Sequence, residues 1–271
     1  MDDCSTDGSV EYIEKNMNKF LNCKLIKNNE RQLPFLSRLH GFRAANGDYC
    51  ICLDCDDYVD TTYYENLLNE IKASGADMCV GDVTLENDRA YRINSKFFER
   101  PEKNYDVGEN WLNFMCFSGK NKFNSICNKL VSRQVLNNAL NELKDIGDWA
   151  KISNMDDFIM LMIFSFYTKK LVYVEKAKYH YVMHSEQSTK FNSADKIKMQ
   201  LKSFVFGYNV VEKFLKTKNL KEKYNIRIRK GIRTSFKHIR AVAILNHYDN
   251  DEDVKSLLNL EFFKPEIFYQ H

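Results

Sequence analysis

This sequence has very little proline and no long hydrophobic run. Three of its 271 residues are proline, 44% are hydrophobic and 13% are aromatic, which excludes a disordered or low-complexity chain and is typical of a folded soluble protein. No window approaches the roughly 18 uninterrupted apolar residues that a membrane-spanning helix needs. The first residues, MDDCSTDGS, are acidic and polar, so they are not a secretory signal peptide.

The charge balance and the cysteines also exclude several classes of protein. A net charge of +3 is too small to indicate a nucleic-acid partner by itself. The eight cysteines are scattered through a chain without a secretory signal. We therefore expect reduced thiols in the cytoplasm, several of them buried as small hydrophobic side chains.

Strand-like and helix-like runs alternate along the chain. A polar turn precedes a helical pattern that ends near Phe20, and the run YCICL at residues 49–53 is apolar throughout, as in a strand buried on both faces. A helix is predicted over residues 63–71 and another strand over 78–83. This rhythm predicts an α/β fold with a mainly parallel mixed sheet flanked by helices.

The second half of the chain continues this rhythm and then changes character. Residues 125–136 (SICNKLVSRQVL) predict a short strand leading into a helix, and FIMLMIFSFY predicts an apolar helix capped by Asp156 and Asp157. LVYVE and KYHYVMH, at residues 171–175 and 178–184, predict two strands. Long basic helical segments follow, so we expect one domain over residues 1–190 and a C-terminal basic helical region over 191–271.

Residues 47–60, GDYCICLDCDDYVD, contain two kinds of metal ligand. Zinc usually takes four ligands, often from paired Cys-x2-Cys turns, and no second cysteine or histidine pair stands near Cys50, Cys52 and Cys55. The carboxylates offer a better account, because Asp54 and Asp56 follow a buried strand and can face one hard cation, Mg²⁺ or Mn²⁺. The alternative is an acidic surface turn.

The order of the motifs resembles the family 2 glycosyltransferases. DDCSTDGS, SRLHGFRAANGDY and CICLDCDDYVD are similar to the family patterns VDDGSTDGS, ARNxGxxxAxGeY and hhhLDsDDxh. SICNKL resembles the family's wNKLy element, MDDF its EDxxF element, and YHYVMHSEQS its Y-x-Y-x-x-R/H-x-x-S stretch. The resemblance covers about residues 1–190 and implies the GT-A fold, with a DxD motif that binds nucleotide-sugar and metal.

The chain departs from the family pattern in two ways. In the family the first strand, the first helix and most of the second strand precede the DDGS turn, whereas Met1 stands in that turn here. We therefore expect an N-terminally truncated fold. Leu39 stands where the family has the asparagine after Arg38, and Asp156 where it has a glutamate.

The resemblance implies a role for each matching residue. Catalysis falls to Asp157 as the general base, with Asp156 positioning the acceptor or the base. Metal binding falls to Asp56 and Asp54. The residues implied to bind substrate are Asp3 (nucleobase), Arg38 (nucleotide), Asp54 (ribose), Lys129 (phosphate or acceptor), and His184 and Ser188 (diphosphate or metal).

These residues also have simpler interpretations that involve no binding or catalysis. Asp3 can hold a turn, Asp156 and Asp157 can cap a helix, and Arg38, Lys129 and His184 can be solvated surface residues.

The implied activity is inverting transfer of a sugar from a nucleotide-diphosphate sugar, by default a UDP-sugar, to a glycan or lipid-linked acceptor in bacterial cell-surface polysaccharide synthesis. Mn²⁺ or Mg²⁺ would be the cofactor. The alternative is a non-catalytic truncated fragment that retains nucleotide or partner binding.

The basic helical region suggests where in the cell the protein is located. Fourteen lysines and arginines stand against two acidic residues between Lys196 and Arg240. Such helices either pack on the catalytic domain with solvated basic faces or contact anionic lipid headgroups. We expect a cytoplasmic protein, in the second case peripheral at the inner face of the membrane, and no nucleic-acid partner because no recognition motif is visible.

Overall fold

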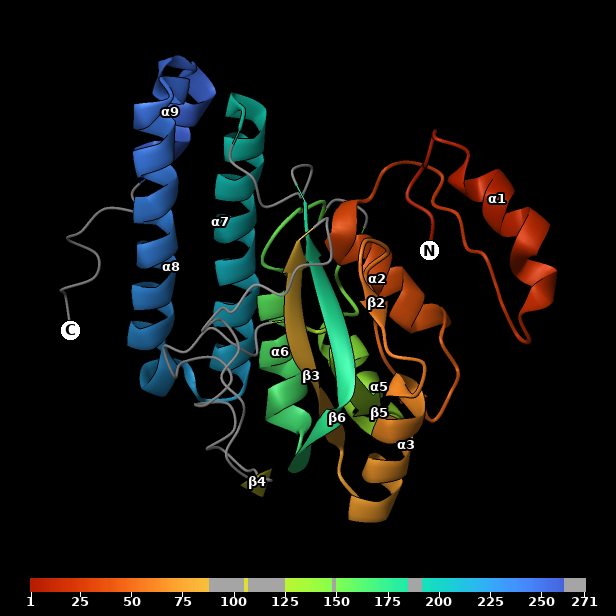
Figure 1. The fold of residues 1–271 in the computed structure, drawn as a ribbon. Helices are drawn as coiled ribbons and strands as arrows, with labels where there is room; N and C mark the ends of the chain where they lie inside the picture. The colour runs from red at the N-terminus through yellow and green to blue at the C-terminus, as the bar shows by residue number, and fades with distance from the viewer. Residues whose placement is uncertain (88–104, 107–124, 148–149, 185–191, 261–271) are drawn as a thin grey trace.

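The computed structural model describes residues 1–87, 105–106, 125–147, 150–184 and 192–260. Within these residues six strands form a sheet in the order β1-β5-β3-β6-β2, with β4 beside β6, and helices pack around it (Figure 1). The strands are β1 (Tyr49–Cys50), β2 (Tyr58–Val59), β3 (Met78–Asn87), β4 (Tyr105–Asp106), β5 (Lys129–Ser132) and β6 (Lys170–Met183). The predicted α/β class is confirmed.

Strand direction in this mixed sheet is less uniform than the sequence predicts. Among the described strands only β3 and β6 pair in parallel, and the other four pairings are antiparallel. The reason is β5, which lies between β1 and β3 and runs against both. Consequently β1, β3 and β6 point the same way, and their carboxyl ends meet at one edge of the sheet, the edge at which α/β proteins bind ligands.

The predicted strand at residues 49–53 is shorter in the structure. Only Tyr49 and Cys50 pair with β5, and Leu53 is 43% exposed. The chain turns away from the sheet just afterwards, where the backbone N–H of Asp57 donates to the carbonyl of Asp54 at 3.2 Å. A tight turn rich in aspartate therefore replaces the end of the strand.

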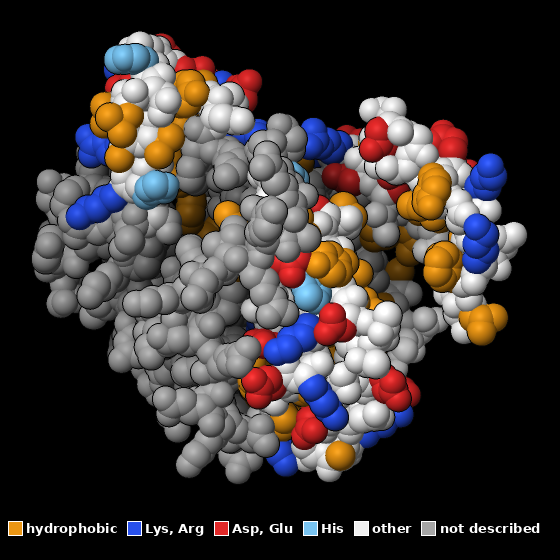
Figure 2. Space-filling view, in the orientation of Figure 1, with side chains coloured by type: hydrophobic (Ala, Val, Ile, Leu, Met, Phe, Trp, Pro, Cys, Tyr) orange, Lys and Arg blue, Asp and Glu red, His pale blue; other side chains and the backbone are white. Residues whose placement is uncertain are grey.

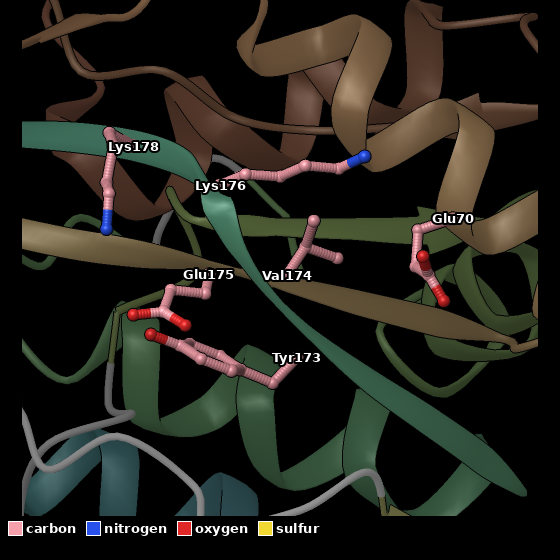
Figure 3. Close-up of a pocket in the computed structure, with 6 residues that line it drawn as sticks. All are labelled: Glu70, Tyr173, Val174, Glu175, Lys176 and Lys178. Atoms are coloured by element: carbon pink, nitrogen blue, oxygen red, sulfur yellow. The ribbon is translucent and has the colours of Figure 1, made fainter.

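The two strands predicted at residues 171–175 and 178–184 are one strand, β6. Its pairing with β3 continues on both sides of a register shift between Gly81 and Asp82, where residues 175–177 are left out of the ladder. Such a bulge interrupts the alternation of side chains, so one long strand has the sequence pattern of two. Figure 3 shows the side chains around this bulge, which line a hollow open to solvent.

The helices are α1 (Ser9–Asn16), η1 (Met17–Lys19), α2 (Leu33–Ala44), α3 (Tyr63–Ser74), α5 (Arg133–Glu142), α6 (Asp156–Tyr167), α7 (Ala194–Thr217), α8 (Lys221–Leu245), η2 (Tyr248–Asn250) and α9 (Glu252–Leu258). The helices predicted before Phe20, over residues 63–71 and after the strand β5 are confirmed. Figure 1 shows α7 and α8 side by side at one end of the molecule and α1 at the other. The division of the chain at residue 190 stays a prediction.

Hydrophobic side chains are exposed at the α1 end of the molecule (Figure 2). Helix α1 contributes no buried residue, and Tyr12, Phe20 and Leu21 in and after it are 71%, 66% and 97% exposed. Within the described part of the chain, no helix has both the length and the apolar character that crossing a bilayer requires.

Helix α6 is buried between the sheet and α7. Its residues 159–165 are all buried, which explains why this stretch is apolar on every side. Helix α7 also binds the segment just before α6. The side-chain amide of Asn154 donates to Gln200 at 2.5 Å, and the backbone N–H of Ser153 donates to the hydroxyl of Ser203 at 3.3 Å. Helix α7 therefore holds the segment that leads into α6.

The contact between α7 and the segment before α6 can be tested by a substitution at Gly207 on α7. A Cβ at Gly207 would lie 2.7 Å from Cβ of Met155, the residue before α6. Alanine normally stabilises a helix by about 0.5–1 kcal/mol relative to glycine, but here the clashing atom is held by the backbone. Overpacking costs about 1–3 kcal/mol, so we expect Gly207→Ala to lower the free energy of unfolding in denaturant titrations. The exposed Lys202→Ala on the same helix is the control, and it should change stability by less than about 0.5 kcal/mol; a stabilised Gly207→Ala protein would contradict the contact.

Candidate active site

Most of the predicted site residues come from segments that meet at the carboxyl edge of the sheet. The aspartate turn follows β1, and Arg38 lies in the middle of α2. Because β5 runs against β1, the residues just before β5 approach those just after β1. Helix α6 leads into β6 through a two-residue connection, so it runs back across the sheet and its first turn lies at the same edge.

Arg38 connects three of the predicted carboxylates. Its guanidinium donates to the carboxylates of Asp156 and, at 2.5 Å, of Asp54, and it lies 3.6 Å from Asp157. The Arg38 side chain is 15% exposed and that of Asp156 is 7% exposed. Burial by itself lowers the pKa of Arg38, but the surrounding carboxylates outweigh it and raise this pKa. Arg38 is thus a charged centre of the site and not the surface arginine of the simpler interpretation.

Asp156 and Asp157 form the first turn of α6. Neither caps the helix, because the N-cap position is Met155 in a left-handed conformation with φ 71°. The partial positive charge of a helix N-terminus favours carboxylates in this turn. Burial, and then the negative charge of Asp156, raise the pKa of Asp157 to about 7, although Arg38 and the backbone N–H of Ile126 act to lower it. A carboxylate with this pKa can exchange a proton near neutral pH.

The turn after β1 presents its aspartates in different ways. Asp57 accepts hydrogen bonds from the hydroxyl of Tyr179 and the backbone N–H of Val182, both on β6. Burial raises the pKa of Asp57 to about 6 in spite of these bonds. Asp56 is exposed, and one of its oxygens lies 2.9 Å from Nε2 of His184. Asp57 therefore anchors the turn to the sheet and leaves Asp56 facing solvent beside His184.

A hard divalent cation fits this turn. One carboxylate oxygen from each of Asp54, Asp56 and Asp57 lies within 4.8 Å of the others, and carboxylate oxygens are the ligands that Mg²⁺ and Mn²⁺ prefer. Since the oxygens of Asp57 are bound to β6, Asp54 and Asp56 are the carboxylates available to hold the ion. His184 adds an imidazole nitrogen, a ligand that carboxylate sites for Mn²⁺ can include.

Asp3 lies away from this cluster and supports α2. Its carboxylate accepts from the backbone N–H groups of Gln32 and Leu33, at 2.6 and 2.9 Å, and from the side-chain amide of Asn28 at 2.8 Å. Burial acts to raise the pKa of Asp3, but these hydrogen bonds lower it overall. The structure shows the turn-holding interpretation directly, and the contact with a nucleobase stays a prediction.

Lys129 is not the solvated lysine of the simpler interpretation. Its side chain is buried, and its ammonium group donates to the carbonyl of Ser125 and to the side chain of Asn128. Burial lowers the pKa of Lys129 to about 7, while the nearby Asp157 acts to raise it. Lys129 lies at the first residue of β5, where a core position favours packing over contact with solvent. Ser188, the remaining predicted residue, lies outside the described residues.

Several cysteines are buried, as the sequence predicts. Cys50 and Cys79 are buried, and Cys55 is exposed. Cys127 is also buried. Its sulfur lies within 4.8 Å of that of Cys52 and 3.8 Å from the guanidinium of Arg38. Neither the place of Cys127 in the site nor the bond between Tyr179 and Asp57 is predicted by the sequence. Cys127 and Tyr179 lie inside the SICNKL and YHYVMHSEQS motifs, which was the available signal.

The hollow of Figure 3 is a separate feature. Its lining residues are Glu70, Tyr173, Val174, Glu175, Lys176 and Lys178. None of them belongs to the carboxylate cluster, so the hollow is not part of the candidate active site.

Comparison with solved structures defines the class of fold. The crystal structure of Staphylococcus aureus TarS residues 1–349 in complex with UDP-GlcNAc matches with a TM-score of 0.50 and 16% identity, over 100% of this chain and 82% of that chain. A second TarS crystal structure matches with a TM-score of 0.52 and 15% identity, over 97% of this chain and 47% of that one. At such identities the likeness shows the fold alone, and that fold is the GT-A type.

Comparison of sequences identifies the family. The family model described as Glycosyl transferase family 2 matches residues 1–139, which is just over half of the chain. The chain belongs to the family 2 glycosyltransferases. A curated relative, the cholesterol galactosyltransferase of Borreliella burgdorferi, is 40% identical over 78 residues, which are 29% of this chain and 22% of that protein. The chain thus matches only about a fifth of the length of that relative.

Proposed function

We propose that this enzyme transfers a sugar from a nucleoside-diphosphate sugar to a hydroxyl group of a glycan or lipid-linked acceptor, with inversion at the anomeric carbon, in bacterial cell-surface polysaccharide synthesis. The observation that supports this most is the position of Asp157. It lies beside Arg38, in the same cluster as Asp54, and burial raises its pKa to about 7. A general base for an alcohol at neutral pH requires this combination of geometry and pKa.

In this proposal Asp157 accepts the proton of the acceptor hydroxyl as the hydroxyl oxygen forms its bond to the anomeric carbon. The bond between that carbon and the diphosphate oxygen breaks on the opposite face, so the configuration inverts. Arg38 donates a hydrogen bond to Asp156, and this contact holds the first turn of α6 against α2. The cation held by Asp54 and Asp56 would neutralise the charge of the departing diphosphate.

The donor is a UDP-sugar in this proposal, because the TarS structure of similar fold holds UDP-GlcNAc. The acceptor is a glycan or a lipid-linked carrier. The C-terminal helices would bring the enzyme to such carriers at the inner face of the membrane, because basic helices are attracted to anionic headgroups.

The metal site can be tested with Asp56→Asn. Turnover of UDP-sugars by the wild-type chain should depend on Mn²⁺, and the substitution should weaken Mn²⁺ binding at least about tenfold, because even outer-shell partners of a metal are worth about 10–100-fold in affinity. Binding is measured by the electron paramagnetic resonance of Mn²⁺ in the presence of UDP, and turnover by UDP release.

The matched control is Cys55→Ser, an exposed neighbour in the same turn, which should keep both properties. If the wild-type chain turned over no donor but still bound UDP and Mn²⁺, the result would favour the non-catalytic fragment instead.

A further inference from the structure

Two thiols and a carboxylate converge at the base of the candidate active site. One ligand atom from each of Cys52, Asp54 and Cys127 lies within 4.8 Å of the other two. Cys52 and Asp54 follow β1, and Cys127 precedes β5, 75 positions later in the sequence. The antiparallel register, in which Cys50 faces Val131, brings these two segments together.

The surroundings of the thiols suit a metal that prefers sulfur. The sulfurs of Cys52 and Cys127 lie within 4.8 Å of each other, and the guanidinium of Arg38 lies 3.8 Å from the Cys127 sulfur. Cys127 is buried, whereas the side chain of Asp54 is 30% exposed and leaves a path from solvent. Two sulfurs and one carboxylate oxygen make three of the four ligands of a tetrahedral Zn²⁺ ion, and water can supply the fourth.

We propose that Cys52, Asp54 and Cys127 form a second cation site, specific for thiophilic divalent ions such as Zn²⁺ and Cd²⁺. When the ion binds, each thiol releases its proton to solvent, and the carboxylate of Asp54 turns from Arg38 to the metal. No electron is transferred and no other bond changes.

The site has a consequence that rests on the proposed function. Asp54 belongs both to this thiol site and to the carboxylate turn that holds Mg²⁺ or Mn²⁺. A thiophilic ion in the first site therefore removes a ligand from the second and releases Arg38 from one of its partners. Since thiolates favour Zn²⁺ over Mn²⁺, Zn²⁺ inhibits the enzyme even when Mn²⁺ is in excess.

Cadmium binding tests the site without any need for turnover. Cd²⁺ is titrated into the full reduced chain, and binding is followed by the ultraviolet charge-transfer absorption of cadmium thiolate. We expect one tight ion in the wild type, and an affinity at least about tenfold weaker in Cys127→Ser and in Cys52→Ser, because a direct ligand is worth no less than the outer-shell partners that contribute about 10–100-fold. Cys55→Ser, which removes an exposed thiol of the same turn, should retain the tight ion.

Two results would overturn the site. One is an equal affinity for Cd²⁺ in the wild type and in both Cys52→Ser and Cys127→Ser, each confirmed as folded by its circular dichroism. The other is loss of the tight ion in Cys55→Ser. If Cd²⁺ binds as expected but Zn²⁺ does not inhibit UDP-sugar turnover, the thiol site is confirmed and its proposed inhibitory role is wrong. If no turnover occurs at all, only the proposed function fails.

Discussion

Asp157→Asn is expected to lower kcat by about 10²–10⁴-fold, which is the usual contribution of a general base. The amide has nearly the shape of the carboxylate but cannot accept the proton of the acceptor hydroxyl. Donor binding should change little, because Asp56 and the rest of the turn after β1 remain. The measurement is the rate of sugar transfer at saturating donor, together with the affinity for UDP. Asp48→Asn, at an exposed position, is the control and should retain wild-type rates.

The pH dependence gives this prediction a second readout. Because burial raises the pKa of Asp157 to about 7, the base is protonated below that pH, and kcat should rise as the pH increases through about 7. The stability contribution has the opposite direction. A carboxyl whose pKa is raised in the folded state binds its proton more tightly there, so stability falls as the pH rises from about 4, the pKa of an unfolded aspartate, to about 7.

Asp157→Asn removes this effect and should therefore equal or exceed the wild type in thermal stability at alkaline pH. A variant that loses activity because it unfolds, or one that keeps wild-type kcat, would contradict the assignment of Asp157 as the base.

Arg38→Met is expected to lower the free energy of unfolding by about 3–5 kcal/mol, the cost of removing one partner from a buried ion pair. The methionine keeps most of the hydrophobic stem but leaves the buried carboxylate of Asp156 without its cation, and Asp54 without its partner at 2.5 Å. Activity should be lost as well, since the first turn of α6 would no longer be held against α2. The measurement is denaturant unfolding followed by tryptophan fluorescence or circular dichroism.

The pH dependence separates this electrostatic cost from a packing defect. Between about pH 8 and about pH 5 Asp157, whose pKa burial raises to about 7, takes up a proton. Arg38 lies 3.6 Å from this carboxyl, so the loss of stability should be clearly smaller at about pH 5 than at about pH 8. A packing defect would give the same loss at both. The control is Arg31→Met, at an exposed position just before α2, which should cost less than about 0.5 kcal/mol. A loss for Arg38→Met as small as that of the control would show that Arg38 is not a structural centre of the site.

Local sequence patterns were sufficient for the class of fold and for most helices. The spacing of apolar residues predicts α3 and α5, and the uniformly apolar FIMLMIFSFY predicts a buried helix, because these signals arise within one element. The same patterns failed at the ends of strands. β1 ends at Cys50 because of the aspartate turn, and β6 continues through a bulge, and both features depend on the pairing with neighbouring strands.

The order of motifs along the chain determined the family and the identity of the candidate acidic residues, because those residues stand at fixed positions within short motifs. It did not determine their partners. Arg38 binds Asp156, which lies 118 residues away in the sequence. The sulfur of Cys127 lies within 4.8 Å of that of Cys52 because β1 pairs with β5. The burial of Lys129 also depends on strand pairing, because Lys129 is the first residue of β5 and this strand lies inside the sheet.

The sequence by itself therefore determined which chemical groups this protein carries at its strand ends. Only the tertiary structure decided which of them face one another, because that depends on strand register and on the return of α6 across the sheet. These long-range pairings have no local signal, and they also set the burial that raises the pKa of Asp157 to about 7.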